Sequence, residues 1–312
     1  MTDDFRLLMI SAMYENGGNT THRLMDGHPQ LHVYPFESQI GTAHVRDGLR
    51  SLFPVKYRWP EFLLAATPAM DFHAIVDEEA KVRVRTPGVS KFRHARFDMD
   101  DDERRAIYCS LVDRTGRSRG ANVEAFFRAT HLAWKNEGCS GEEIAYVGYS
   151  PVIAVDTEKI LADLPGAHVL HVVRNPWSAY ADTKKRPVPL TLDDYMLRWN
   201  LHQHFALTTR ALHPDRVHVV RIEDVMDDPL SALGEPLGAF GVSTAHTLTQ
   251  PSWNGEPLEE VYPWGTLRRI TPEANRATAG ELTSAENERI GALAWQYLGE
   301  FAYGDFLAGV AV

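Results

Sequence analysis

Short apolar runs alternate along this chain with stretches long enough to form helices, and this alternation restricts its fold more than any other feature. The apolar runs predict buried strands at residues 6–11, 31–34, 144–147, 167–173 and 216–222. Helical patterns are expected at residues 123–135, 156–164, 192–212 and 283–301. Strands separated by helix-length segments need crossover connections. The sequence therefore predicts an α/β fold in which a parallel β-sheet is flanked by helices.

The length of 312 residues bears on the domain organisation. It exceeds the length at which one core usually suffices, yet α/β folds often keep this many residues together. We expect a single domain over residues 1–312. The segment at about 47–141 mixes helical patterns with a basic stretch at residues 83–96, and it is expected to be an insertion or a lid. The C-terminal helix begins with Thr283 and Glu286, in the Ser/Thr-x-x-Glu pattern of a capping box.

Charge and cysteine content exclude several classes of function. The formal net charge of −10 makes the average surface repel nucleic acid and anionic lipid, so a small molecule or carbohydrate fits better as a partner. The first residues do not resemble a signal peptide, and no apolar run is long enough to span a bilayer, so a cytoplasmic protein is expected. Cys109 and Cys139 lack the spacing of a zinc motif or a disulfide framework.

Residues 12–21 follow the first predicted strand, at a favoured ligand position in open parallel sheets. Glycines allow successive backbone N–H groups to face one concavity, and the following helix adds the positive end of its dipole. The pattern is typical of a phosphate site, with candidate residues Asn16, Gly17, Gly18, Asn19, Thr20 and Thr21. A tight turn without a ligand is the alternative. A Walker-type ATPase or kinase is disfavoured, because no lysine precedes Lys56.

Three ordered segments resemble the sulfotransferase family that uses 3′-phosphoadenosine 5′-phosphosulfate (PAPS). The first is Tyr14-Glu-Asn-Gly-Gly-Asn-Thr-Thr-His-Arg-Leu-Met-Asp-Gly-His-Pro29, similar to the family's phosphosulfate loop, helix and His-Pro pair. The others are Val172-Val-Arg-Asn-Pro176 and Val220-Arg-Ile-Glu-Asp-Val-Met-Asp-Asp-Pro229, with a matching end at Phe301-Ala-Tyr303. The resemblance implies a P-loop-like sulfotransferase fold, sulfuryl transfer as the activity and PAPS as the co-substrate.

By this resemblance, Arg174 would bind the 3′-phosphate of the donor. Its place directly after a predicted strand agrees with that role, because a guanidinium can form two parallel hydrogen bonds to a phosphate. A strand-end salt bridge is the alternative. Arg221 lies beside Glu223 and Asp224, so an ion pair is at least as good an interpretation as a ligand contact.

Three positions depart from the family pattern. Glu15 stands in place of the loop arginine, Tyr149 in place of a lysine, and Asp182 in place of a serine that contacts the 3′-phosphate. Carboxylates beside a phosphate weaken its binding unless cations outnumber them. Asp182 and Arg268 remain candidate donor-binding residues alongside Arg174. Cations that would compensate are Lys184, Lys185, Arg186, Arg268 and Arg269, and Ser178 and Thr183 are nearby substitutes for the serine. A different donor is the other possibility.

Sulfuryl transfer needs a base for the acceptor and positive charge at the leaving phosphate oxygen. Glu37 is the expected base, since the branch of the family that acts on tyrosine has a glutamate soon after its His-Pro pair. A capping or hydrogen-bonding role for Glu37 is equally compatible with the sequence. His22 is the alternative catalytic residue and His28 a further one, although a buried structural histidine is the simpler interpretation of each.

Two rival functions stay open at this point. Asp98 and Asp100 form an Asp-x-Asp pattern, such as nucleotide-sugar glycosyltransferases use to hold a metal, but an acidic helix start explains them more simply. A non-catalytic nucleotide-binding protein could have kept the fold. We expect instead a sulfotransferase that acts without a metal on a hydroxyl or amine of a small-molecule or carbohydrate acceptor.

Overall fold

A five-stranded sheet forms the centre of the protein. The computed structural model describes residues 5–63, 65–86, 88, 95–258, 261–262, 265–266 and 272–309. The strands are β1 (Leu7–Ala12), β2 (Leu31–Val33), β3 (Ala145–Tyr149), β4 (Ala167–Val173) and β5 (Val217–Arg221). They lie in the order β2-β3-β1-β4-β5, and every neighbouring pair is parallel. The predicted α/β fold with a parallel sheet is confirmed, and each predicted strand forms within two residues of its expected bounds.

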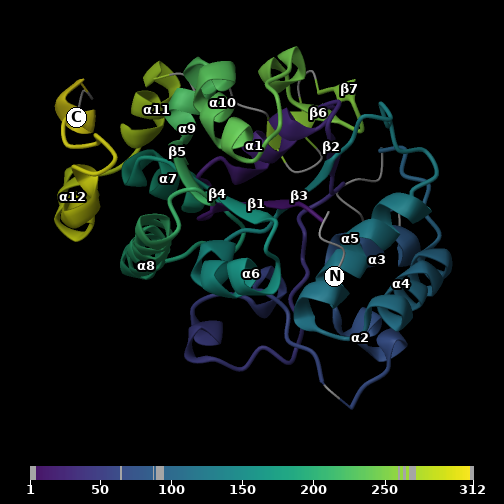
Figure 1. The fold of residues 1–312 in the computed structure, drawn as a ribbon. Coiled ribbons are helices and arrows are strands. Elements are labelled where there is room, and N and C mark those ends of the chain that lie inside the picture. Colours follow the sequence, from purple (N-terminus) through teal and green to yellow (C-terminus); the bar gives the residue numbers. More distant parts are fainter. Residues whose placement is uncertain are drawn as a thin grey trace.

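Helices lie above and below this sheet (Figure 1). They are α1 (Gly18–Met25), α2 (Pro68–Ala74), α3 (Glu78–Arg85), α4 (Asp101–Thr115), α5 (Arg119–Ala133), α6 (Thr157–Asp163), α7 (Pro176–Thr183), α8 (Leu192–Leu212), α9 (Ile222–Asp227), α10 (Pro229–Ala239), α11 (Pro272–Ala279) and α12 (Ser284–Leu298). α1, α9 and α10 share an apolar core with one face of the sheet, whereas α5 and α6 share a core with the other face.

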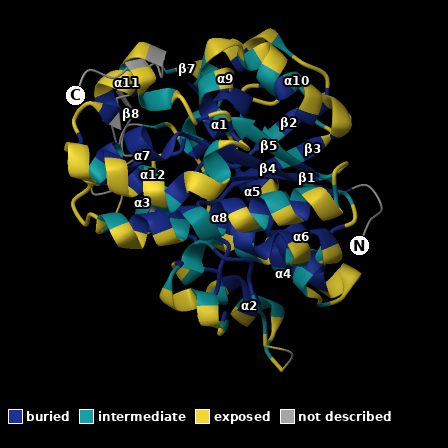
Figure 2. Ribbon diagram, turned by 90° about the vertical axis from the view of Figure 1, so that its left-hand side faces the viewer, coloured by how far each residue is buried: buried dark blue, intermediate teal, exposed yellow. Residues whose placement is uncertain are grey.

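β1 is buried along its whole length because helices cover both of its faces. Successive side chains of a strand point to opposite faces. Leu7 and Met9 accordingly join the core beneath α5 and α6, whereas Leu8 and Ile10 join the core beneath α1 and α10. Figure 2 shows the result as buried strands at the centre and exposed outer faces on the helices.

The segment between β2 and β3 contains α2, α3, α4 and α5. Phe126 and Phe127 of α5 belong to the same core as Met9 of β1, so the last helix of the segment expected as an insertion or lid is part of the sheet packing. Earlier in the segment, α2 packs on α4 and α4 packs on α5. Of the basic stretch at 83–96, residues 87 and 89–94 lie outside the described residues, and Arg83 donates a hydrogen bond to the carbonyl of Ala95.

The C-terminal helix α12 has the predicted capping box, since the side chain of Thr283 accepts from the N–H of Glu286 and that of Glu286 accepts from the N–H of Thr283. Its buried Ile290 and Ala294 pack in one core with Trp199 of α8. Two small antiparallel pairs precede this region: β6 (Ser252–Trp253) with β7 (Glu256–Pro257), and β8 (Val261–Tyr262) with β9 (Gly265–Thr266). Among the helices that the structure describes, none has the length and apolar character needed to cross a membrane.

The strand order makes β1 and β4 the neighbouring strands whose connections leave in opposite directions. The chain leaves β1 through α1 toward β2 at one edge of the sheet, and it leaves β4 toward β5 at the other edge. Ligands of open α/β sheets bind where the connections diverge in this way, beyond the carboxyl ends of the strands. The turn after β1 and the residues that follow β4 are therefore the place to look for a site.

Candidate active site

The turn after β1, residues 13–17, leads directly into α1. Glu15 has a φ of 60° and Gly17 a φ of 88°, so both adopt the left-handed backbone region, and the N–H of Asn16 donates to the carbonyl of Met13 over 3.1 Å. No side-chain hydrogen bond caps α1 among the described residues, and its first turn contains no acidic residue. The first N–H groups of a helix lack intrahelical acceptors. This end of α1 is therefore suited to an anion.

The two glycines of the turn allow close packing around it. A Cβ atom on Gly17 would lie 2.3 Å from Cγ1 of Ile222, and the positive φ adds strain for any other residue. A Cβ atom on Gly18 would lie 2.5 Å from the ring of Tyr149 and 2.6 Å from Cβ of Ala12. Packing alone thus accounts for glycine at both positions, whether or not the turn also binds a phosphate.

Replacing Gly18 with alanine should therefore destabilise the fold. The added methyl group meets the buried Tyr149 ring and the side-chain Cβ of Ala12 in β1, neither of which can move freely, so the free energy of unfolding should fall by about 1–3 kcal/mol. Denaturant unfolding measures the change. Gly238→Ala is the matched control, because Gly238 lies exposed in α10 with no atom within 4 Å of the added Cβ. Equal stability of the two variants would contradict the packing argument.

Asn16 connects the turn to the end of β4. Its side chain is completely buried, and its Oδ1 accepts from the N–H of Arg174 over 3.0 Å. Its Nδ2 donates to the carbonyl of Tyr14 over 2.8 Å and to the hydroxyl of Tyr195, on α8, over 3.0 Å. All of the polar atoms of this side chain are thus used to hold the turn and β4 in register.

Arg174 lies at the carboxyl end of β4 and points toward the turn. Its Nη1 donates to the carbonyl of Glu15 over 3.0 Å and pairs with the carboxylate of Asp182 over 2.8 Å. Its Nε donates to Oδ1 of Asn275, on α11, over 2.9 Å. Arg174 is only 6% exposed. Its guanidinium is held by neighbours from three parts of the chain. Arg174 therefore forms the strand-end salt bridge, with Asp182, and also lies at the turn, as a phosphate-binding role requires.

Carboxylates balance the cations on this side of the turn. Asp182 also pairs with Lys185 over 3.2 Å, and Lys185 pairs with Glu281 over 2.7 Å. Lys184 pairs with Glu286 over 2.7 Å. Four cations face four carboxylates: Arg174, Lys184, Lys185 and Arg186 against Glu15, Asp182, Glu281 and Glu286. Arg268 and Arg269, the other expected cations, lie outside the described residues.

The remaining residues of the predicted phosphate turn lie in the first turns of α1. Asn19 and Thr20 are half-buried, whereas Thr21 is fully buried and its hydroxyl donates to the carbonyl of Gly17 over 3.1 Å. Ser178 and Thr183, the expected substitutes for the missing serine, are also buried, and their hydroxyls donate to the carbonyls of Asn275 and Ala179.

Glu37 lies beside the turn, in a group of tyrosines. The hydroxyl of Tyr57 donates to its Oε2 over 3.0 Å, and the carboxylate is half-buried. The Glu37 charge helps to raise the pKa of Tyr57 and Tyr149 well above the ordinary value, although burial contributes more. Burial likewise raises the pKa of Tyr14 to about 12. The structure therefore brings Glu37 to the Tyr149 side of the turn, with neutral phenols around it.

The two candidate histidines are buried. His22 has no exposed surface, contacts Nη2 of Arg23 through both ring nitrogens and lies with its ring 5.6 Å from that of Tyr149. Burial and the Arg23 charge hold its pKa well below 6.5. Nε2 of His28 lies 2.8 Å from the carbonyl of Ser243, and its Nδ1 accepts from the N–H of Gln30 over 3.1 Å. The contacts of both rings with the protein are structural.

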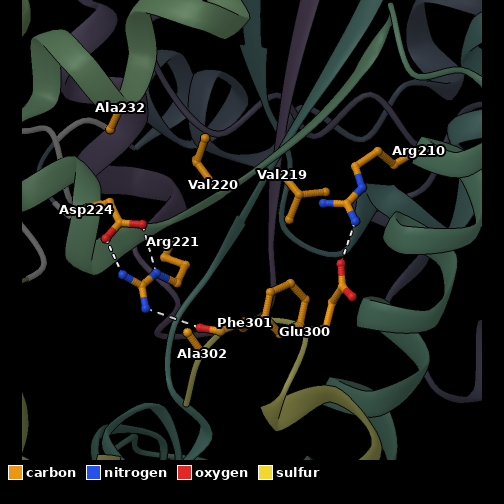
Figure 3. A pocket seen from close by; sticks show the side chains of 9 residues that line it. All are labelled: Arg210, Val219, Val220, Arg221, Asp224, Ala232, Glu300, Phe301 and Ala302. Carbon is orange, nitrogen blue, oxygen red and sulfur yellow. Dashed lines mark hydrogen bonds and ion pairs between the residues drawn. The ribbon is translucent and has the colours of Figure 1, made fainter. Parts of the chain in front are cut away.

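A hollow of about 360 Å³ lies beside β5, at the edge of the sheet (Figure 3). Arg221 points into it and donates to Asp224 and to the carbonyl of Phe301, as the ion-pair interpretation predicted. Across the hollow, Arg210 pairs with Glu300 over 2.5 Å. The residues around it are Arg210, Val219, Val220, Arg221, Asp224, Ala232, Glu300, Phe301 and Ala302. Since β4 separates β5 from β1, this hollow is distinct from the turn between β1 and α1.

The Asp-x-Asp pattern forms a helix start. Asp100 is the N-cap residue of α4, and its Oδ1 accepts from the N–H groups of Asp102 and Glu103 over 2.8 and 3.0 Å. These hydrogen bonds hold the pKa of Asp100 below its ordinary value. Asp98 precedes the helix, and its N–H donates to Oδ1 of Asn136 over 2.8 Å. The capping role accounts for the acidic cluster.

A protein-family model described as "Sulfotransferase family" matches residues 11–245, a span that contains the turn after β1, Arg174 and β5. The chain belongs to the sulfotransferase family. The sulfotransferase domain from the Synechococcus PCC 7002 olefin synthase is similar in structure, with a TM-score of 0.53 and 16% sequence identity over 94% of both chains. This likeness supports the fold alone.

Two further solved structures resemble this sulfotransferase more weakly. The sulfotransferase domain from the curacin biosynthetic pathway has a TM-score of 0.47 and 13% identity, and it covers 92% of this chain and 96% of that one. Sulfotransferase STF9 from Mycobacterium avium has a TM-score of 0.46 and 13% identity, with 96% and 77% covered. No curated protein sequence matches the sulfotransferase significantly.

Sequence reasoning missed several residues of this sulfotransferase's candidate site. Asn275 contacts Arg174 from α11, and Glu223 accepts from both the N–H and the Nδ2 of Asn175 beside it. Tyr57 orients Glu37 from a short 3-10 helix (Val55–Tyr57). Asn275 and Tyr57 lie in no recognisable motif. Glu223 lies within the third family-like segment, and that is the signal that could have suggested it.

Proposed function

We propose that this sulfotransferase moves a sulfuryl group from PAPS to a hydroxyl or amine of a small-molecule or carbohydrate acceptor. The observation that carries the proposal is the juxtaposition of the uncapped start of α1 with Arg174 at the carboxyl ends of β1 and β4. Backbone N–H groups at a helix start and a guanidinium are two groups that commonly bind phosphate in proteins. Asn16 supports the assignment because it joins the two segments rigidly.

The balanced charge of the site sets a condition on donor binding. A phosphate on Arg174 would share the guanidinium with Asp182. We infer that Asp182 then relies on Lys185, with which its other oxygen is already paired over 3.2 Å. Arg186, whose guanidinium lies 4.7 Å from the Tyr14 ring centroid and 3.8 Å from Oε1 of Glu15, supplies a further cation at the mouth of the turn.

The proposed reaction divides between Glu37 and the start of α1. When bound, PAPS supplies a sulfuryl group on a good leaving group. The acceptor O–H or N–H loses its proton to Glu37 as its oxygen or nitrogen forms a bond to sulfur, and Tyr57 keeps the carboxylate in place. The bond from sulfur to the bridging phosphate oxygen breaks, and that oxygen keeps the electron pair. The first N–H groups of α1 stabilise the charge that develops there, so the proposal requires no metal.

Titration with 3′-phosphoadenosine 5′-phosphate (PAP), the product of the donor, tests the proposal directly. The wild-type protein should bind PAP with a submillimolar Kd in calorimetry, and Arg174→Ala should weaken binding by more than about tenfold, because a charge-assisted hydrogen bond contributes roughly 1.5–3 kcal/mol. Arg216→Ala is the matched control. Arg216 directly precedes β5, at the ends of the strands opposite to Arg174. It donates to the carbonyls of Leu161 and Pro165.

The result that overturns the proposal is the absence of PAP binding by the folded wild-type protein. That outcome would make the chain a member of the family that does not use PAPS. An equal loss of affinity in Arg174→Ala and Arg216→Ala would show that the effect reports stability and not a contact with the phosphate.

A further inference from the structure

Three side chains that bind metals well meet on the α5 side of the sheet, at the edge strand β2. They are His32 of β2, His131 in the last turn of α5, and Glu137 in the loop that follows. Nδ1 of His131 lies 2.7 Å from Oε1 of Glu137, and Nδ1 of His32 lies 3.0 Å from the same oxygen. One ligand atom from each residue lies within 4.8 Å of the others.

The surroundings of the cluster hold these side chains in place. His32 pairs in register with Tyr146 of β3, and the Tyr146 ring lies 5.0 Å from the His32 ring and 5.4 Å from the His131 ring. The loop stays close to α5, because the N–H of Glu137 donates to the carbonyl of Trp134 over 3.3 Å. The His131 side chain is 3% exposed and that of Glu137 is 11% exposed, so both are set in the protein interior.

Cys139 follows closely along the chain, but its thiol is not one of the grouped ligand atoms. The N–H of Cys139 donates to the carbonyl of Glu137 over 3.1 Å. Cys139 is exposed, and the side chain of His32 is 22% exposed. The cluster is therefore open to solvent on the Cys139 and His32 side and closed on the His131 side.

Two imidazoles direct Nδ1 at the same oxygen of Glu137, and both contacts are within hydrogen-bond distance. One polar atom of the cluster is left over, since Nε2 of His131 is buried without a hydrogen-bond partner among the described residues. Two ligand atoms of a tetrahedral zinc ion lie about 3.3 Å apart, as follows from Zn–N and Zn–O bonds of about 2.0–2.2 Å. The two N···O distances of 2.7 and 3.0 Å are shorter than that spacing, so the ligand atoms move apart by about 0.3–0.6 Å when they hold an ion.

We propose that His32, His131 and Glu137 bind a Zn²⁺ ion. Two imidazoles and one carboxylate supply three protein ligands, a water molecule from the open side completes a four-coordinate site, and the two nitrogen ligands favour zinc over magnesium or calcium. The ion ties the edge strand β2 to the connection between α5 and β3. It is separate from the turn between β1 and α1 and does not depend on the proposed donor.

Zinc alone is the probe for the experiment. The full chain is stripped with a chelator, and Zn²⁺ binding is measured by competition with a chromophoric chelator. We expect one ion per chain, a higher Tm in the presence of zinc, and an affinity loss in His32→Asn larger than the roughly 10- to 100-fold caused by changes around the ligands. His218→Asn is the matched control, since His218 lies in β5 at the other edge of the sheet.

Cobalt substitution tests the ligand set independently of affinity. Co²⁺ in the wild-type protein should show the intense visible bands of four-coordinate geometry, and Cys139→Ser should leave both these bands and the zinc affinity unchanged, because the exposed thiol is not among the grouped ligand atoms. A wild-type chain without saturable zinc binding would overturn the site, as would equal affinities of His32→Asn and His218→Asn. A sulfur-to-cobalt charge-transfer band in the wild-type protein would contradict the ligand set.

Discussion

Replacing Glu37 with glutamine should reduce kcat by about 10²- to 10⁴-fold and leave PAP binding unchanged, because positioned general bases contribute rate factors of that size. The glutamine keeps an oxygen that can accept the Tyr57 hydroxyl bond of 3.0 Å, but it cannot take a proton from the acceptor. Initial rates with a phenol or sugar acceptor that the wild-type enzyme sulfates give kcat, and calorimetry with PAP gives the Kd.

Glu103→Gln serves as the matched control for this variant. Glu103 lies on the exposed side of α4, where it pairs with Lys135 over 3.1 Å, and its replacement should change neither quantity. Unchanged turnover in Glu37→Gln would move the base to another residue. Proportional losses of turnover and of PAP affinity would identify Glu37 as a structural carboxylate.

Acidification from pH 6.5 to pH 4 should destabilise the protein strongly, because several histidines are buried in the neutral form. Burial lowers the pKa of His171 to about 4, and it holds the pKa of His22 and His202 well below 6.5. The unfolded chain therefore binds more protons in this interval than the folded chain does. Their contribution to stability is complete above pH 6.5 and declines as the pH falls toward the folded pKa. His171 alone accounts for about 3 kcal/mol.

Urea unfolding at a series of pH values measures this effect. The free energy of unfolding of a typical domain is about 5–15 kcal/mol, so the urea concentration at the unfolding midpoint should fall steeply below pH 6.5. His171→Asn should reduce the slope of stability against pH, whatever its effect on stability at pH 7, whereas His246→Asn, on the exposed surface, should leave the slope unchanged. A stability profile that is flat between pH 6.5 and 4 would contradict the prediction.

The sheet and its main helices could be predicted from the sequence because their signals are local. α8 has the predicted bounds of residues 192–212, and the capping box at Thr283 defines the start of α12. The packing of the segment at about 47–141 was harder to predict. The sequence of α5 does not distinguish a helix in an insertion from a helix that covers the sheet, and only the packing of Phe126 and Phe127 on the sheet identifies α5 as a crossover helix.

Much of the candidate site could not be predicted, since its contacts join distant segments. Asn275 lies 101 residues from Arg174, its hydrogen-bond partner, and no spacing in the sequence relates the two. The same holds for His32 and Glu137, which are 105 residues apart, so no compact zinc motif in the sequence contains both. The family-like segments, in contrast, identified Arg174 because a strand and a short pattern coincide there.

The hydrogen bonds of Arg174 also bear on how the chain acquires its site during synthesis. Asn16 can bond to Arg174 only after 158 further residues have been made, and Arg174 can bond to Asn275 only after another 101. Contacts between such distant segments form late and slowly, because long loops must close first. A nascent chain of which only the first half has left the ribosome therefore cannot form this site. Binding of a nucleotide at this site would indicate that nearly the whole polypeptide has been synthesised and folded.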